Sequence, residues 1–176
     1  TTATDKKTGE KVIVAGKKVT IVDTVTLDGL EEGRKYQLKG WQMLKEENAE
    51  LLIDGKRVES DYTFVADNEK MKVEISYMFD ASELGGQNLV TFEELYDLKN
   101  PEEPVKVAEH KDINDEGQTI HIPAAQTTAT DDSSKINVSE AKKEVSVTDT
   151  VAYRNLVPGK EYTVRGTAVD KETGEP

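Results

Sequence analysis

The sequence repeats itself after 126 residues, and this repeat constrains the fold more than any other feature. The segment TTATD at 1–5 returns at 127–131, and VTIVDTV at 19–25 returns as VSVTDTV at 145–151. The match continues without gaps, because GLEEGRKYQLKG returns as NLVPGKEYTVRG with its first leucine, its tyrosine and its last two glycines unchanged. A period of this length corresponds to a whole domain and exceeds the roughly 20–50 residues of a solenoid unit.

The repeat divides the chain into two parts. Residues 1–123 are predicted to form one complete domain, and 124–176 are predicted to hold a linker and the N-terminal part of a second, truncated repeat. The segment PAAQ at 123–126 is interpreted as the short linker between the copies. We expect the chain to be a piece of a longer array of such domains.

The pattern of apolar residues indicates strands throughout. Val19, Ile21, Val25 and Leu27 alternate with polar residues, as in a strand with one buried face. The dipeptide Asp54-Gly55 between two short apolar runs predicts a tight hairpin turn. Further strands are expected at 36–44, 57–65, 71–79, 88–96 and 105–108. Closely spaced strands with few helical segments predict an all-β fold, an immunoglobulin-like β-sandwich.

Composition excludes several classes of function. The net charge of −12 argues against a nucleic-acid partner, because phosphate binding needs clustered Lys and Arg. No stretch reaches the roughly 18 apolar residues of a membrane-spanning helix, so we expect no membrane contact by this segment. The absence of cysteine excludes disulfides, thiolate nucleophiles and cysteine zinc sites. A secreted β protein of this composition needs another means of resisting unfolding.

An aspartate interrupts the apolar series of the strand at 19–27. Asp23 occupies its centre, and Asp149 occupies the same position in the second copy. An unpaired carboxylate in a protein core costs several kcal/mol or takes up a proton. We therefore predict a buried, partnered carboxyl group at both positions.

A second acidic anomaly lies in the strand QNLVTFEELYDL. Glu93 shares one face of this strand with Leu89 and Leu95, whereas Glu94 shares the other face with Phe92. Whichever face is inward, one glutamate lies on it. Periodicity alone does not decide between the two.

The segment HKDINDEGQTIHIP at 110–123 contains both histidines and a polar residue in an apolar register. Gln118 begins an alternation with two isoleucines, and His110 stands eight residues before it, across an acidic loop. His121 alternates with the same isoleucines and is predicted to face solvent.

The acidic loop partly matches the start of a calcium-binding EF-hand loop. Asp112, Asn114 and Glu116 stand at alternate positions before Gly117, but the twelfth position, which needs a glutamate, falls on Pro123. No flanking helices are expected either. We reject an EF-hand and predict no metal or other cofactor.

Threonines cluster on the expected first strand. Thr1, Thr2 and Thr4 lie there, and three threonines recur in the second copy at 127, 128 and 130. Strand propensity alone accounts for such a cluster. The chain contains no G-x-S-x-G nucleophile elbow, so serine-hydrolase chemistry of that type is not indicated.

Together these residues resemble the VaFE-repeat family, the Thr–Gln ester-bond domains of Gram-positive surface adhesins. The resemblance runs through TTATD, IVDTV, GRKYQLKG, LVTFEEL and HKDINDEGQT, and the last motif is the most specific because it fixes His and Gln eight apart. It implies an immunoglobulin-like sandwich in which a threonine of the first strand is joined to a glutamine of the last strand. The implied bond is a side-chain ester that forms autocatalytically with loss of ammonia.

The resemblance also implies roles for individual residues. Gln118 would be the electrophile and His110 the nearby proton-transfer residue. Asp23 and the glutamate of TFEEL would form the acidic part of the site. The family's Phe-Glu step points to Glu93, with Glu94 as the alternative.

The nucleophile implied by the family pattern is Thr1, which shares a face with Ala3, and Thr2 is the alternative. The function implied is that of a structural stalk module in a cell-wall-anchored, extracellular adhesin or pilus-like fibre. The protein would then not be an enzyme beyond its single-turnover self-cross-linking. Its partners would be neighbouring repeats of the same chain and, for the whole adhesin, a host-surface ligand.

Two rival functions use the same fold. The first is a ligand-binding adhesin domain without the cross-link, which predicts an exposed aromatic or polar patch; aromatic residues make up only 6 % of the chain, and Trp41 is the sole tryptophan. The second is a hydrolase that uses Asp23, Glu93 and His110 on an external substrate, which requires an open cleft.

Overall fold

A computed structural model describes residues 1–176 and contains strands and turns but no helix. It confirms the predicted all-β sandwich. The strands are β1 (Thr2–Asp5), β2 (Val19–Leu27), β3 (Lys35–Leu44), β4 (Ala49–Glu50), β5 (Leu52–Ile53), β6 (Lys56–Arg57), β7 (Glu59–Val65), β8 (Met71–Phe79), β9 (Asn88–Asp97), β10 (Val105–His110), β11 (Thr119–His121), β12 (Ala124–Asp131) and β13 (Val147–Arg154).

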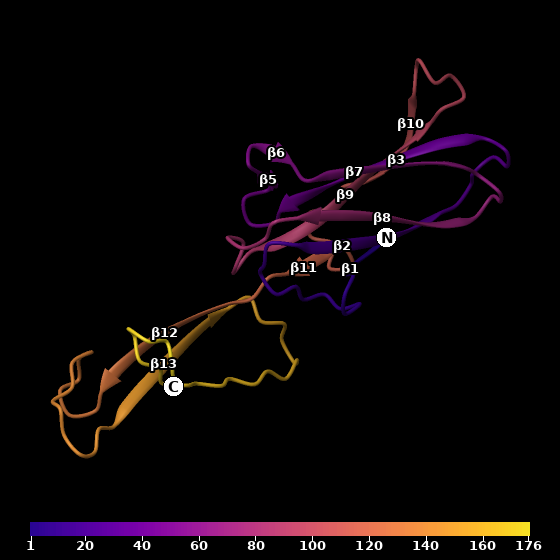
Figure 1. The fold of residues 1–176 in the computed structure, drawn as a ribbon. Coiled ribbons are helices and arrows are strands. Elements are labelled where there is room, and N and C mark those ends of the chain that lie inside the picture. The colour runs from indigo at the N-terminus through magenta and orange to yellow at the C-terminus, as the bar shows by residue number, and fades with distance from the viewer.

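Two antiparallel sheets form the sandwich of the first repeat (Figure 1), and β5 and β6 form a separate two-stranded sheet. The smaller sheet has the order β1-β2-β8. The larger sheet has the order β10-β9-β3-β4, with β7 also beside β3 and β11 also beside β9. Between them lies a core of 22 buried apolar residues, to which β2 contributes Val19, Ile21, Val25 and Leu27. The alternation read from the sequence is the alternation seen in this strand.

The predicted hairpin turn is confirmed between β5 and β6. Asp54 and Gly55 both have positive φ angles, 51° and 74°, as a two-residue turn of the favoured hand requires.

Strand β9 brings distant parts of the sequence together. Its C-terminal half, 93–97, pairs with β10, and its N-terminal half, 88–90, pairs with β11. The acidic loop at 111–118 connects these two strands, so it crosses the middle of β9. The last residue of the loop, Gln118, accepts a backbone hydrogen bond from Thr91. The topology therefore carries His110 and Gln118 to neighbouring positions beside one strand.

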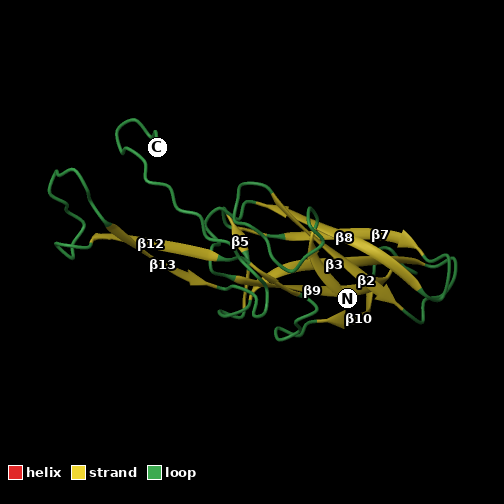
Figure 2. Ribbon diagram, turned by 90° about the horizontal axis from the view of Figure 1, so that it is seen from below, coloured by secondary structure: helices red, strands yellow, loops and turns green.

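The second repeat is a hairpin of β12 and β13 that extends from one end of the sandwich (Figures 1 and 2). Because β12 begins at Ala124, most of the predicted linker is strand. No second sheet packs against the hairpin, and Val147 and Tyr153 are mostly exposed. The prediction of a buried carboxyl at Asp149 is wrong for the same reason: the side chain lies on an uncovered strand and is exposed.

Candidate functional site

The carboxamide of Gln118 lies at the centre of a buried polar cluster. The side chain is fully buried, and its Nε2 donates to Asp23 Oδ2 at 3.3 Å and to Glu93 Oε2 at 3.5 Å. Asp23 comes from the smaller sheet, and Glu93 comes from the larger sheet. The cluster therefore spans the core between the two sheets.

Strands β2 and β9 each bury one carboxyl group in the core. Asp23 has an exposed fraction of 0 % and Glu93 of 2 %. Burial, together with the adjacent Asp23, raises the pKa of Glu93 to about 11. Glu93 is consequently a neutral carboxylic acid at physiological pH, able to donate a proton.

Glu94 lies on the opposite face of β9, where it forms ion pairs with Lys106 and Lys111. Partial burial opposes the ionisation of Glu94. The hydrogen bonds from Lys111, Tyr96 and Lys106 outweigh this effect and lower the pKa of Glu94 to about 2. The structure thus separates two glutamates that the sequence pattern left equivalent.

The two candidate threonines also face opposite ways. Ala3, fully buried, pairs directly with Asp23 across the β1–β2 ladder. Thr1 lies two residues before Ala3 and therefore on the same face, and its hydroxyl oxygen is buried without a hydrogen-bond partner. Thr2 points outward and is exposed. This arrangement favours Thr1 as the residue that faces the cluster.

His110 lies at the edge of the cluster. Its backbone pairs with Glu93, and its Nε2 is 2.7 Å from Asp115 Oδ2, so the acidic loop holds the imidazole in place. Thr1, Glu93 and His110 line the same cavity, which has a volume of about 220 Å³. The structure therefore brings all five predicted residues to one region, with His110 as the member nearest to solvent.

Unpartnered polar atoms are concentrated here. Buried side-chain oxygens without a hydrogen-bond partner occur on Thr1, Asp23, Glu93, Gln118 and Tyr77. Buried polar groups are normally paired, and exceptions occur where a site performs chemistry. Four of these five residues were singled out from the sequence.

Tyr77 was missed because it fits the apolar series of β8 and raises no anomaly by itself. Its side chain crosses the core toward Gly40, whose neighbour across the β3–β9 ladder is Glu93. Burial raises the pKa of Tyr77, and the neighbouring carboxyl groups of Glu93 and Asp23 add to this effect. Gly40 recurs as Gly166 in the second repeat. This recurrence was the available sequence signal that the position facing Tyr77 requires a glycine.

Substituting Gly40 by alanine is expected to destabilise the first repeat by about 1–3 kcal/mol, because an inserted methyl group overpacks the core. The new Cβ would lie 1.8 Å from the Tyr77 hydroxyl and 3.2 Å from the Phe92 carbonyl oxygen. Chemical denaturation measures the loss. Gly166→Ala is the matched control, since no atom lies within 4 Å of its Cβ position. Adding Tyr77→Phe to Gly40→Ala should recover part of the loss, and equal stability of the two alanine variants would contradict the prediction.

Lys11 is a second residue that sequence reasoning missed. Its ammonium donates to the carbonyl oxygen of Ala3 at 2.6 Å and also to that of Gly117. The backbone nitrogen of Ala3 donates to Gly117 as well, at 3.0 Å. Lys11 therefore links β1 by hydrogen bonds to the loop that carries Gln118. No sequence signal distinguishes it from the other surface lysines.

The prediction that His121 faces solvent is wrong. The side chain is half-buried, and its Nδ1 lies 3.4 Å from Oδ1 of Asn155 in the second repeat. The alternation with its neighbours was read correctly, but the outer face at this position is covered by the second repeat.

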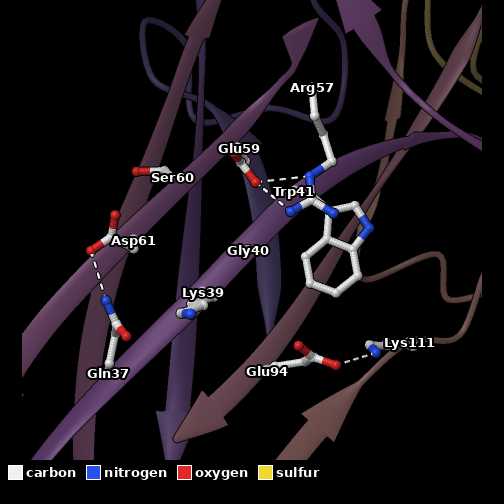
Figure 3. Close-up of a pocket in the computed structure, with 10 residues that line it drawn as sticks. All are labelled: Gln37, Lys39, Gly40, Trp41, Arg57, Glu59, Ser60, Asp61, Glu94 and Lys111. Carbon is white, nitrogen blue, oxygen red and sulfur yellow. Dashed lines mark hydrogen bonds and ion pairs between the residues drawn. The ribbon is translucent and has the colours of Figure 1, made fainter. Parts of the chain in front are cut away.

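A separate polar groove surrounds Trp41 on the outer face of the larger sheet (Figure 3). It has a volume of about 540 Å³. Arg57 and Lys111 each lie 5.1 Å from the tryptophan ring, and each forms an ion pair with a glutamate of the groove. Gln37 likewise donates to Asp61. Arg57, Lys111 and Gln37 thus each have a polar partner within the groove, unlike the unpartnered oxygens around Gln118.

The structure contains no helix that could span a membrane. No group of three or more His, Cys, Asp or Glu side chains is arranged to hold a metal ion.

The family comparison decides the assignment. The family model described as "T-Q ester bond containing domain" matches residues 1–122 and 123–176. The chain belongs to the T-Q ester bond domain family. This finding confirms the resemblance seen in the sequence motifs.

Solved structures support the fold. The chain is similar to a bacterial adhesin from Mobiluncus mulieris that contains intramolecular disulfide, isopeptide and ester bond cross-links. In one crystal form the TM-score is 0.56 at 15 % identity, and in a second form it is 0.54 at 16 %. Each match covers 88 % of this chain and 72 % of the adhesin. Among curated proteins no similar sequence was found.

Proposed function

We propose that the chain is a stalk module of a surface adhesin or pilus-like fibre, strengthened by an ester bond between Thr1 and Gln118 that the domain forms by itself. The observation that carries this proposal is the buried Gln118 carboxamide, held between Asp23 and Glu93, together with the unpartnered hydroxyl of Thr1, a residue that lines the same cavity as Glu93. Membership of the T-Q ester bond family supports the same chemistry.

The reaction replaces an amide by an ester. The Thr1 hydroxyl oxygen attacks the carboxamide carbon of Gln118, and the hydroxyl proton passes to Asp23. The C–N bond of the tetrahedral intermediate then breaks as Glu93 gives a proton to the departing nitrogen, which leaves as ammonia. A proton transfer from Asp23 to Glu93 restores the pair. His110, whose side chain is 38 % exposed, exchanges protons between the buried pair and solvent.

The fold supplies what free threonine and glutamine lack. A hydroxyl is a weak nucleophile and an amide is a weak electrophile. Holding the two groups in contact raises their effective concentration greatly, and a buried neutral acid is available to protonate the leaving group. Each domain carries out this reaction once, on itself, so the protein is not an enzyme toward other molecules.

The bond would tie the first strand of the domain to its last. Tension applied to the ends of the array would then pass from Thr1 through the ester to β11 and on to β12. The residues between Thr1 and Gln118 would lie outside the loaded path. A chain without cysteine thereby gains a covalent reinforcement.

This function places the protein outside the cell, in a cell-wall-anchored surface protein of a Gram-positive bacterium. Its partners in that setting are the neighbouring repeats and a host-surface ligand bound elsewhere in the adhesin. A ligand-binding role for the Trp41 groove is less well supported, because the two cations beside the tryptophan ring, Arg57 and Lys111, are each paired with a glutamate. A hydrolase role is opposed by the complete burial of Gln118 and Asp23.

Intact-mass measurement tests the proposal. We expect the native chain to be lighter than its sequence mass by one ammonia molecule, because only the first repeat contains both reacting residues. Gln118→Ala should show the full mass of its own sequence. A freshly purified, folded native chain at full sequence mass would refute the cross-link, and tandem mass spectrometry of a digest would locate the bond.

A further inference from the structure

The second repeat contacts the first through the turn that follows β13. Because β13 runs antiparallel to β12, it returns to the end of the sandwich from which β12 left (Figure 1). The turn begins at Asn155, which meets the first repeat at Gln87, His121 and Ile122. We call this contact the inter-repeat joint.

The side chain of Asn155 is satisfied entirely by the first repeat. Its Nδ2 donates to the carbonyl oxygen of Gln87 at 2.7 Å and to that of Ile122 at 3.3 Å. Its Oδ1 lies 3.4 Å from Nδ1 of His121, which must carry the proton of that contact because Oδ1 can only accept. One amide therefore connects three residues on two segments of the first repeat.

The backbone conformation at Asn155 suits glycine or asparagine, so the presence of asparagine points to a role for its side chain. Its φ angle is 60°, in the left-handed region that most side chains avoid. The equivalent residue of the first repeat is Gly29, with a φ angle of 79°, so the turn itself needs only glycine. Asparagine tolerates this conformation and adds a side chain, which here makes contacts that glycine cannot make.

Neighbouring residues extend the joint. The guanidinium of Arg154 lies over Gly86, about 3.5 Å from the position that a Cβ would occupy there. Lys160 forms an ion pair with Glu10 of the first repeat. Both ion-pair partners are substantially exposed, so this pair contributes little, and the half-buried Asn155 makes the main polar contacts of the joint.

We propose that the Asn155 turn is a docking surface for the preceding repeat and fixes the angle between the two repeats. The polypeptide link at Pro123 is one attachment, and by itself it would allow the two repeats to rotate relative to each other. Asn155 supplies a second attachment on another strand, and two attachments restrict this rotation. The proposal rests on the stalk role described above, and its partner is the Gln87, His121 and Ile122 edge of an adjoining repeat.

Distance measurements between two spin labels test the joint in the whole chain. The absence of native cysteine allows labels at Lys72→Cys on β8 and Thr150→Cys on β13, both exposed. Double electron–electron resonance should give a narrow distance distribution for this labelled parent. Asn155→Gly keeps the backbone conformation but removes the amide. Each hydrogen bond lost should lower the ratio of docked to undocked molecules by about fivefold, which broadens the distribution.

Two further variants sharpen the result. Asn155→Asp keeps an acceptor for His121 but cannot donate to the two carbonyl groups, so it should also broaden the distribution. Lys135→Gly is the matched control: Lys135 has a φ angle of 62° in the second repeat and takes no part in the joint, so the distribution should stay narrow. A parent distribution as broad as that of Asn155→Gly, or an unchanged distribution in Asn155→Gly, would overturn the proposal.

The intact mass of each labelled sample separates this proposal from the ester. Loss of one ammonia in every variant, with broadening only at residue 155, supports both the cross-link and the joint. Full sequence mass with the same pattern of broadening refutes the cross-link and still supports the joint.

Discussion

A Thr1→Val variant is expected to unfold about 15–25 °C below the native chain, because it has nearly the same shape but cannot form the ester. The cross-link closes a loop from Thr1 to Gln118, and the loop-closure model assigns such a loop about 4–5 kcal/mol of stability. Removing a hydroxyl that has no hydrogen-bond partner costs little by itself. The fall in melting temperature therefore measures the contribution of the ester. Differential scanning calorimetry, with intact mass on the same samples, measures this fall.

Thr2→Val is the control for this measurement. Thr2 is exposed, so the variant should keep both the mass deficit and the native melting temperature. Thr1→Ser should also keep the deficit, because serine retains the hydroxyl. Loss of the deficit in Thr2→Val but not in Thr1→Val would move the nucleophile to Thr2 and contradict the assignment.

Glu93→Gln is expected to slow cross-linking by about 10²–10⁴-fold, the usual contribution of a general acid or base. Glutamine has the shape of the neutral acid found here but has no acidic proton to give to the leaving nitrogen. Since the buried Glu93 is itself neutral, the substitution should leave the fold intact. The variant should be isolated mostly at full sequence mass, and its slow conversion can be followed by intact mass over days.

Glu94→Gln is the matched control, one residue along the same strand. It breaks ion pairs on the outer face of β9 and should cross-link as completely as the native chain. If Glu93→Gln is already fully cross-linked on isolation, Glu93 is not the proton donor.

The fold was predictable because the strands follow simple alternation. The period of two in β2 predicted both the buried face and the misplaced Asp23, and the Asp54-Gly55 turn was read directly. The second repeat was less predictable. Alternation marks the face that a strand would bury, but Val147 and Tyr153 stay exposed because no sheet covers them.

The site was predictable only in part, for reasons that differ between residues. Asp23 and Gln118 were visible as polar residues in apolar registers. Periodicity could not choose between Glu93 and Glu94, because that choice depends on which face of β9 meets the core. Tyr77 and Lys11 were invisible, because an aromatic core residue and a surface lysine are unremarkable until tertiary contacts place them. His121 was misjudged because its cover comes from a turn 34 residues away.

The complete burial of Gln118 bears on how long the proposed cross-link would last. Esters hydrolyse in water, but bulk water has no access to a carbonyl carbon enclosed between two sheets. Hydrolysis then has to wait for the first strand to detach, and Lys11 helps to hold that strand against the Gly117 backbone. The lifetime of the proposed bond would therefore be governed by how often the domain opens locally, so a chemically labile linkage would be as durable as the fold that encloses it.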